Sequence, residues 1–108
     1  MKKFLVLYRM DMAMMNKMMK ENPEMGKKGM EEWGAWMKKH AADFADAGGG
    51  IGKNTEVSAS GGVEKSNDIA GYSILKADSK EAALAILKDN PHFTMPNATV
   101  DIAEVMVM

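Results

Sequence analysis

Cysteine is absent from the 108-residue sequence, which excludes disulfide bonds, thiol catalysis and cysteine-ligated zinc in this chain. A chain without cysteine suits a reducing compartment, and we expect a cytoplasmic protein. Long apolar runs are also missing. The apolar stretch 4–8 is followed by Arg9, so it is too short for the apolar region of a signal peptide or for a membrane-spanning helix. The sequence therefore predicts no membrane association.

The chain also lacks an excess of positive or negative charge. The chain has 14 basic and 15 acidic residues, a formal net charge of -1, and its lysines are spread along the sequence. Nucleic-acid surfaces need concentrated positive charge, so we expect neither DNA nor RNA as a partner. The length suits a single domain over residues 1–108 with one modest core.

Methionine is the abundant residue, with 13 copies. Six of them fall within ten positions, at Met10, Met12, Met14, Met15, Met18 and Met19. Thioether sulfur is a soft ligand that suits Cu(I), but softness alone is a weak argument when no histidine or cysteine stands beside it. Methionine also fills irregular gaps and forms helices well. The sequence therefore predicts a packing role for this segment, and neither a metal site nor a cofactor.

The order of the apolar segments predicts a β-α-β-β-α-β fold. Residues 4–8 form a central strand in this interpretation, because they are apolar on both faces. Apolar residues at three-and-four spacing indicate a helix over residues 30–47, which the glycines at 48–50 are expected to end. The remaining expected elements are strands at 55–60 and 69–77, a helix capped by Asp78, and a last strand at 99–107 that is apolar on both faces.

Two smaller features are predicted beside these elements. Residues 55–60 and 63–65 form an exposed hairpin in this interpretation, with Gly61 and Gly62 as its turn. A short helix over 10–20 precedes a break at Asn22 and Pro23, to which Gly26 and Gly29 also belong. Residues 10–28 are therefore a candidate mobile flap.

The predicted order matches a ferredoxin-like arrangement, in which two helices cover one face of a four-stranded antiparallel sheet. The opposite face would stay bare. Because the first and last strands are apolar on both faces, a monomer would expose a larger apolar patch than is usual. We therefore expect a homodimer packed sheet to sheet, with two-fold symmetry.

Six short motifs, in order along nearly the whole chain, resemble the YCII-related (DGPF-like) proteins. They are Tyr8-Arg9, Trp33-Gly34-Ala35-Trp36, Gly71-Tyr72-Ser73-Ile74, Ala77-Asp78-Ser79, Asn90-Pro91-His92 and Glu104-Val105-Met106. The resemblance implies a dimeric α/β-barrel assembly with a cleft between helices and sheet, in a family whose biochemical roles are largely unassigned. Some members are proposed to use a histidine and aspartate pair. Here Trp36 and Met37 stand near the expected histidine position and Asp11 is a loose counterpart of the acid, so the pair is not carried over.

Two histidines are candidates for general acid–base catalysis. His40 and Asp43 stand three residues apart on the expected helix, where the carboxylate could orient the imidazole. The alternative is an ordinary surface charge pair. His92 follows Pro91 in a loop, where functional side chains concentrate, and its alternative role is to cap the carbonyls of the preceding helix.

Four further residues are candidates for ligand binding. Tyr8, Arg9 and Asp11 leave the central strand beside the expected flap, and Arg9 could clasp a carboxylate or phosphate. The alternative for Arg9 is an ion pair with Asp11 or Glu104. Trp36 lies beside the apolar stripe that contains Trp33, so Trp36 is the candidate aromatic wall and Trp33 is expected in the core.

These residues support two hypotheses. The first is a small-molecule-binding protein with a helix–sheet cleft bounded by Tyr8, Arg9, Trp36, His40 and His92, with acid–base catalysis as a further step. The second is a non-catalytic dimeric interaction module that uses the adaptable methionine-rich flap.

Overall fold

The main sheet of the computed structural model, which describes residues 1–106, has four antiparallel strands in the order β2-β5-β1-β6. Their bounds are β1 Lys2–Arg9, β2 Phe44–Gly50, β5 Ile69–Ala77 and β6 Thr99–Glu104. β1 pairs with β5 on one side and with β6 on the other, so the first strand is central as predicted. An α+β fold with an antiparallel sheet is therefore confirmed.

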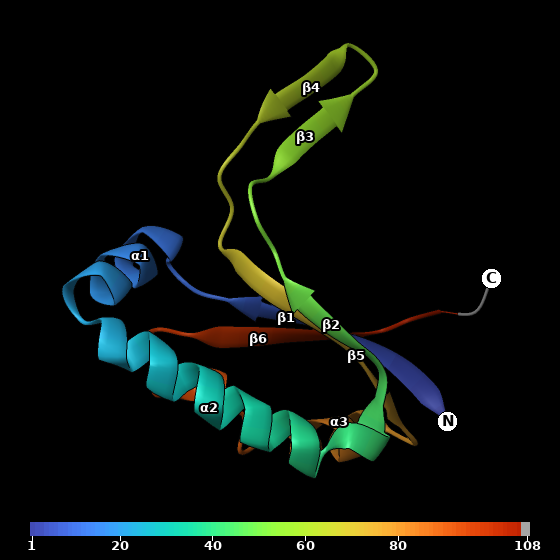
Figure 1. Cartoon of the computed structure of the whole chain (residues 1–108). Coiled ribbons are helices and arrows are strands. Elements are labelled where there is room, and N and C mark those ends of the chain that lie inside the picture. The colour runs from blue at the N-terminus through green and yellow to red at the C-terminus, as the bar shows by residue number, and fades with distance from the viewer. Residues whose placement is uncertain (107–108) are drawn as a thin grey trace.

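Three α-helices accompany this sheet, with bounds α1 Met12–Glu21, α2 Pro23–Lys39 and α3 Lys80–Leu87. Two short 3₁₀ turns, η1 Ala41–Asp43 and η2 Pro91–Thr94, follow α2 and α3. In Figure 1, α2 and α3 lie on the same side of the sheet. None of the described helices is both long enough and apolar enough to cross a bilayer.

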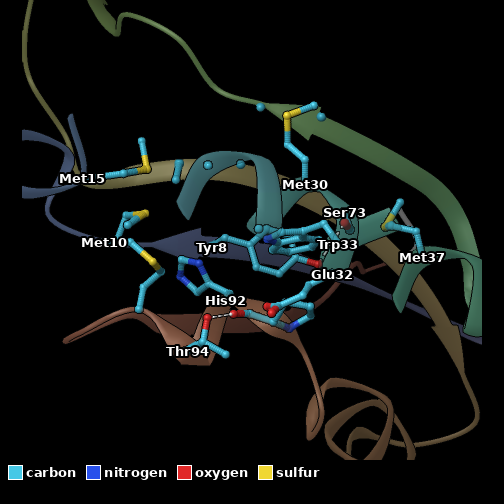
Figure 2. Close-up of a pocket in the computed structure, with 18 of the residues that line it drawn as sticks. Tyr8, Met10, Met15, Met30, Glu32, Trp33, Met37, Ser73, His92 and Thr94 are labelled. Carbon is cyan, nitrogen blue, oxygen red and sulfur yellow. Dashed lines mark hydrogen bonds between the residues drawn. The ribbon is translucent and has the colours of Figure 1, made fainter. Parts of the chain in front are cut away.

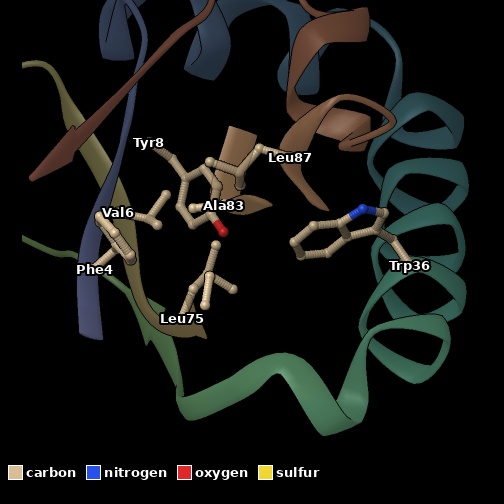
Figure 3. Close-up of a cluster of buried hydrophobic side chains, with 8 residues drawn as sticks. Phe4, Val6, Tyr8, Trp36, Leu75, Ala83 and Leu87 are labelled. Carbon is tan, nitrogen blue, oxygen red and sulfur yellow. The ribbon is translucent and has the colours of Figure 1, made fainter. Parts of the chain in front are cut away.

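The core lies between the sheet and these two helices. Alternate residues of β1, namely Phe4, Val6 and Tyr8, point toward the helices and are buried, as strand geometry requires. Leu75 of β5 is fully buried beside them. Trp36 of α2 and Ala83 and Leu87 of α3 complete the cluster from the helical side (Figure 3).

The first long helix lies further toward the N-terminus than its apolar stripe predicted. α2 begins at Pro23, which the first turn of a helix tolerates because the missing N–H would have no partner there. The helix ends at Lys39, and the three glycines at 48–50 belong to strand β2. The prediction that these glycines end the helix is therefore wrong. They let β2 run against β5, since Gly48 has φ +75° and a Cβ there would collide with the Tyr72 carbonyl.

The hairpin is formed by β3 Thr55–Ser58 and β4 Gly61–Glu64. It is a separate two-stranded sheet that projects from the rest of the molecule (Figure 1). An exposed hairpin is confirmed, but β2, and not residues 55–60, supplies the fourth strand of the main sheet. The turn is at Ala59 and Ser60, where the Ser58 hydroxyl accepts a hydrogen bond from the Ser60 amide, so the prediction of a Gly61-Gly62 turn is wrong.

The expected flap is largely helical. α1 confirms the short helix, and Asn22 separates it from α2. Gly26 and Gly29, however, lie inside α2 and do not belong to a break. At Gly26 the two helices approach closely, because a Cβ there would collide with the Met19 side chain.

Two further boundary predictions need correction. Ser79, not Asp78, caps α3, since its hydroxyl accepts a hydrogen bond of 3.1 Å from the Ala82 amide. β6 ends at Glu104, and Val107 lies outside the described residues. Within β6 only the face toward the helices is apolar, because the residues that alternate with it include the exposed Asp101.

Candidate functional site

A cavity of about 730 Å³ lies between the helices and the main sheet. α1 and α2 contribute Met15, Met19, Met25, Met30, Trp33 and Met37, and the sheet contributes Tyr8, Gly48, Gly49, Gly50, Gly71 and Ser73. The segment around η2 closes one side with Pro91, His92, Thr94 and Met95. Figure 2 shows Tyr8 and Trp33 between two groups of methionines. The lining is mostly apolar, with few side chains that can hydrogen-bond a ligand.

Seven methionines line this cavity: Met10, Met15, Met19, Met25, Met30, Met37 and Met95. Their exposure differs along it. Met10 is 5% exposed, whereas Met30 is 78% exposed and marks the rim. Thioether side chains have several rotatable bonds, so this lining can adapt to the shape of an occupant.

Glycines keep part of the cavity free of side chains. β2 and β5 present backbone at Gly48–Gly50 and Gly71, which forms a shallow floor. On the opposite wall, Gly29 of α2 faces open space, because a Cβ built there would meet nothing within 4 Å. The cavity thus has room beside α2 that a larger side chain would fill.

Tyr8 is held in one orientation by hydrogen bonds that cross the sheet. Its hydroxyl donates to the Ser73 Oγ at 3.0 Å, and Ser73 donates onward to the Ala47 carbonyl, also at 3.0 Å. Trp33 packs edge-on against the phenol ring, with the centroids 5.0 Å apart. Burial raises the pKa of Tyr8, and the hydrogen bond with Ser73 partly opposes this effect. Tyr8 is therefore a fixed, neutral part of the wall.

Asn90 supports the turn that places His92. Its side chain is buried, and Oδ1 accepts a hydrogen bond of 2.8 Å from the His92 amide. Nδ2 makes no hydrogen bond within residues 1–106. Pro91 then begins η2, since its fixed φ suits a first helical position. The sequence Asn90-Pro91-His92 thus fixes the backbone at this side of the cavity.

The His92 side chain is buried, and one of its ring nitrogens is already paired. Nε2 lies 2.8 Å from the Arg9 carbonyl and 3.1 Å from the Thr99 carbonyl. Carbonyl oxygens only accept hydrogen bonds, so Nε2 carries a proton. Nδ1 is hydrogen-bonded to no residue among 1–106. His92 therefore binds strand carbonyls and does not cap the preceding helix, and Nδ1 keeps a lone pair for an occupant.

Arg9 lies at a second, more polar cavity of about 990 Å³ at the base of the hairpin. Its guanidinium donates to both Asp68 oxygens at 2.8 and 3.2 Å and to Asp101 at 2.7 Å. These bonds raise the pKa of Arg9, and Arg9 lowers the pKa of Asp68. The partners are thus Asp68 and Asp101, not the expected Asp11 or Glu104. Asp11 instead caps α1 by accepting from the Met14 amide at 3.1 Å.

His40 and Asp43 do meet, with Nδ1 3.1 Å from the carboxylate, but they line neither cavity. His40 Nε2 also lies 3.3 Å from Asp89, a residue that follows α3. Asp89 further accepts hydrogen bonds from Lys39 at 2.6 Å and from Trp36 at 3.0 Å. Lys39, followed by Trp36 and His40, lowers the pKa of Asp89. This cluster links the ends of α2 and α3.

The structure thus divides the five residues expected around one cleft. Tyr8 and His92 line the apolar cavity, and Arg9 lines the polar one. Trp36, 4% exposed, lies in the core and His40 beside Asp89, so neither lines either of these two cavities. Trp33 takes the place expected for Trp36. The signal for Trp33 was its spacing with Met30 and Met37, which places all three on one helical face.

Among residues 1–106, no group of three or more histidine, aspartate or glutamate side chains is arranged to hold a metal ion. Thioethers are outside that set and remain as potential soft ligands. No protein-family model and no curated protein matches the sequence.

Proposed function

We propose that the protein binds a small, largely apolar molecule in the cavity between its helices and its main sheet. The observation that carries this proposal is the cavity itself, about 730 Å³ in volume and lined mostly by apolar side chains and backbone. Pockets for small molecules typically measure about 300–1,000 Å³ and combine an apolar lining with few polar groups.

The polar groups narrow the class of ligand. Tyr8 uses its hydroxyl proton on Ser73, so it is not free to donate to a ligand. His92 offers Nδ1 as an acceptor. Glu32 and Thr94 also line the cavity and can accept hydrogen bonds. A fitting ligand therefore has at least one N–H or O–H group on an aromatic or aliphatic body. Trp33 and the adaptable methionines would contact that body.

Acid–base catalysis is the second step that we propose for the same site. A base needs a free lone pair within hydrogen-bond reach of the proton it removes, and Nδ1 of His92 meets the first condition. His40 with Asp43, and Arg9 with its two carboxylates, lie outside this cavity. We therefore assign them to the stability of the fold rather than to a reaction.

A second candidate function is an interaction module. Three methionines at the cavity rim, on α1 and α2, are substantially exposed: Met19 at 43%, Met25 at 36% and Met30 at 78%. Flexible thioethers can repack against different partners, which suits a surface that binds a peptide.

We also propose a ferredoxin-like arrangement, membership of the YCII-related family and a homodimer. The strand order β2-β5-β1-β6 with α2 and α3 on one face supports the first two. Leu5, Leu7, Tyr72 and Ile74 support the dimer, since strand alternation places them together on the face away from the helices. A second copy would cover this face.

N-phenyl-1-naphthylamine tests the binding proposal, because it is an uncharged aromatic amine with one N–H donor whose fluorescence rises in apolar surroundings. We expect the wild-type protein to bind it. Gly29→Leu fills the open space beside α2 and should weaken binding by about tenfold or more, a free-energy change of about 1.4 kcal/mol. Gly34→Leu is the matched control, since Gly34 is on the same helix and outside the cavity.

Both substitutions replace a helical glycine by a better helix former, so neither is expected to unfold α2. Equal loss of binding in both variants, or no saturable binding by the wild type, would contradict the proposal. Binding that survives Gly29→Leu but disappears on substituting Met19 and Met30 would support the interaction surface instead.

A further inference from the structure

Seven methionines and the imidazole of His92 line the same apolar cavity. In sequence, His92 is distant from the methionine-rich segment 10–19, yet both line the same cavity. Nε2 of His92 is bonded to the carbonyl of Arg9, the residue directly before Met10. In the view of Figure 2, Met10 and Met15 lie on the His92 side of Tyr8, whereas Met30 and Met37 lie on the other side.

We infer that this end of the cavity is a binding site for a soft monovalent metal ion such as Cu(I), with Met10, Met15, Met95 and Nδ1 of His92 as ligands. Three thioethers and one imidazole nitrogen complete a four-coordinate set. Met10 is almost fully buried, and Met15 and Met95 are half-buried, so the ligand atoms are drawn from the inner part of the lining.

The hydrogen bonds of His92 match those of a metal-binding histidine. Such a residue usually donates its other ring N–H to a carbonyl or carboxylate, which fixes the tautomer and the ring orientation. His92 does this with two carbonyls, at 2.8 and 3.1 Å. With Nε2 bonded to these carbonyls, Nδ1 is the ring nitrogen left to bind an ion.

The ligand chemistry selects the ion. Thioethers are soft ligands that favour Cu(I), whereas Mg²⁺ and Ca²⁺ require several oxygen ligands. Zinc sites usually include thiolates, carboxylates or several histidines. The four proposed ligands contain one imidazole and no charged group. A single positive charge also loses less hydration energy than a double one in an apolar cavity. The set therefore fits Cu(I).

Ag(I) is the probe, because it shares the charge and softness of Cu(I) and does not oxidise in air. Silver nitrate is titrated into protein labelled with ¹³C at the methionine methyl groups, in a chloride-free buffer. At one equivalent we expect shifts of the Met10, Met15 and Met95 methyl signals and of the His92 ring signals. Met14, Met18 and Met106, which line neither cavity, should not shift.

A triple substitution to leucine tests the same ligands by affinity. Leucine has a similar volume to methionine and lacks sulfur, so Met10→Leu, Met15→Leu and Met95→Leu together should leave the fold intact. We expect the affinity for Ag(I) to fall by more than about tenfold. Even substitutions of residues that only support metal ligands lower metal affinity by about 10–100-fold. The control replaces Met14, Met18 and Met106 by leucine and should bind as the wild type does.

Three results would each overturn the ion site. They are a uniform shift of all exposed methionine methyl signals, an unchanged Ag(I) affinity in the cavity variant, and no Ag(I) binding at one equivalent. The site does not depend on the organic ligand proposed above. A wild-type protein that binds the naphthylamine but not Ag(I) contradicts only the ion site. A wild-type protein that binds Ag(I) but not the naphthylamine contradicts only the apolar ligand.

Discussion

At the scale of single residues, the important side chains are those fixed by partners far away in sequence. Tyr8 is held by Ser73, and His92 by the carbonyls of Arg9 and Thr99. The sequence singled out Tyr8 and His92 because one ends a central strand and the other follows a proline in a loop. It could not show which nitrogen of His92 is free, because that depends on a strand carbonyl 83 positions earlier.

The two tryptophans show a similar limit. Helical spacing showed that Trp33 shares a face with Met30 and Met37, and that Trp36 lies beside this face. Periodicity identifies which residues lie together but not whether they face packed side chains or open space. Trp36 meets Phe44 and the core, whereas Trp33 meets the cavity.

Tyr8 gives a prediction for alkaline pH. Unfolded Tyr8 ionises near its ordinary pKa of 10.0, whereas burial raises the pKa of the folded residue. Its contribution to stability is therefore complete below pH 10 and is lost as the pH rises through the folded value. We expect the Tyr8→Phe variant to lose less of its free energy of unfolding at alkaline pH than the wild type does. The lost hydrogen bond to Ser73 should cost about 1 kcal/mol at neutral pH.

Urea unfolding at a series of alkaline pH values measures this difference. Tyr72→Phe is the control, because Tyr72 lies on the other face of β5, and it should keep the full alkaline loss. Parallel stability curves for the wild type and Tyr8→Phe would show that Tyr8 does not make this contribution.

At the scale of elements, β2 is the strand that sequence patterns missed. Its residues, FADAGGG, lack the alternating β-branched and aromatic residues that mark a strand. β2 forms because it pairs with β5, and the pairing is irregular between Phe44 and Asp46 and between Asp46 and Gly49. Glycine at such an irregularity has the same left-handed freedom that makes it common at helix ends, which explains the wrong prediction.

Gly48 and Gly49 offer a matched test of this strand. Gly48→Ala should destabilise the protein by about 1–2 kcal/mol from its left-handed backbone alone, and further through the collision with the Tyr72 carbonyl. Gly49→Ala should have a much smaller effect, since its Cβ would meet nothing within 4 Å. Thermal unfolding of both variants measures the difference, and equal effects would count against this geometry for β2.

Asp89 gives a prediction for the junction of α2 and α3. Lys39, Trp36 and His40 hold the pKa of Asp89 below its ordinary value of 3.8. The contribution of Asp89 is therefore complete above that value and is lost as the pH falls, because the unfolded carboxylate is protonated first. We expect Asp89→Asn to be less stable at neutral pH and to lose less further stability in acid than the wild type.

Acid unfolding followed by circular dichroism checks this prediction. Asp78→Asn is the control, since Ser79 and not Asp78 caps α3. An acid loss that is as steep in Asp89→Asn as in the wild type would assign acid sensitivity to other carboxylates.

At the scale of the whole molecule, the sequence predicted the α+β class and the antiparallel sheet correctly. These predictions succeeded because the central strands are strongly patterned, with buried residues at every second position of β1 and β5. A cavity does lie between helices and sheet, but most of the residues that line it were not predicted. Glycines and methionines say little in a sequence about which way a residue faces. Which methionines of α1 and α2 reach the cavity also depends on how these two helices pack together.

The open face of the sheet gives a prediction about assembly. Leu5 pairs with Ile74, and Leu7 with Tyr72, on the side away from the helices. If a second copy covers this face, the wild type should have twice the mass of one chain in light scattering after gel filtration. Leu5→Glu should yield monomers, because a buried, unpaired charge is strongly unfavourable.

Val57→Glu is the control for the dimer, since Val57 is 77% exposed on the hairpin and far from this face. It should leave the mass unchanged. A wild-type protein with the mass of one chain, or a Leu5→Glu variant that remains a dimer, would contradict the sheet-to-sheet assembly.

The projecting hairpin is expected to be less stable than the rest of the fold. β3 and β4 pair with each other and with no strand of the main sheet, and all eight of their residues are exposed. Two isolated strands are only marginally stable in water, so this arm can open and close while the core stays folded. Its tip at Ala59 and Ser60 is accordingly the place where the chain should best accept an inserted peptide or a reporter group.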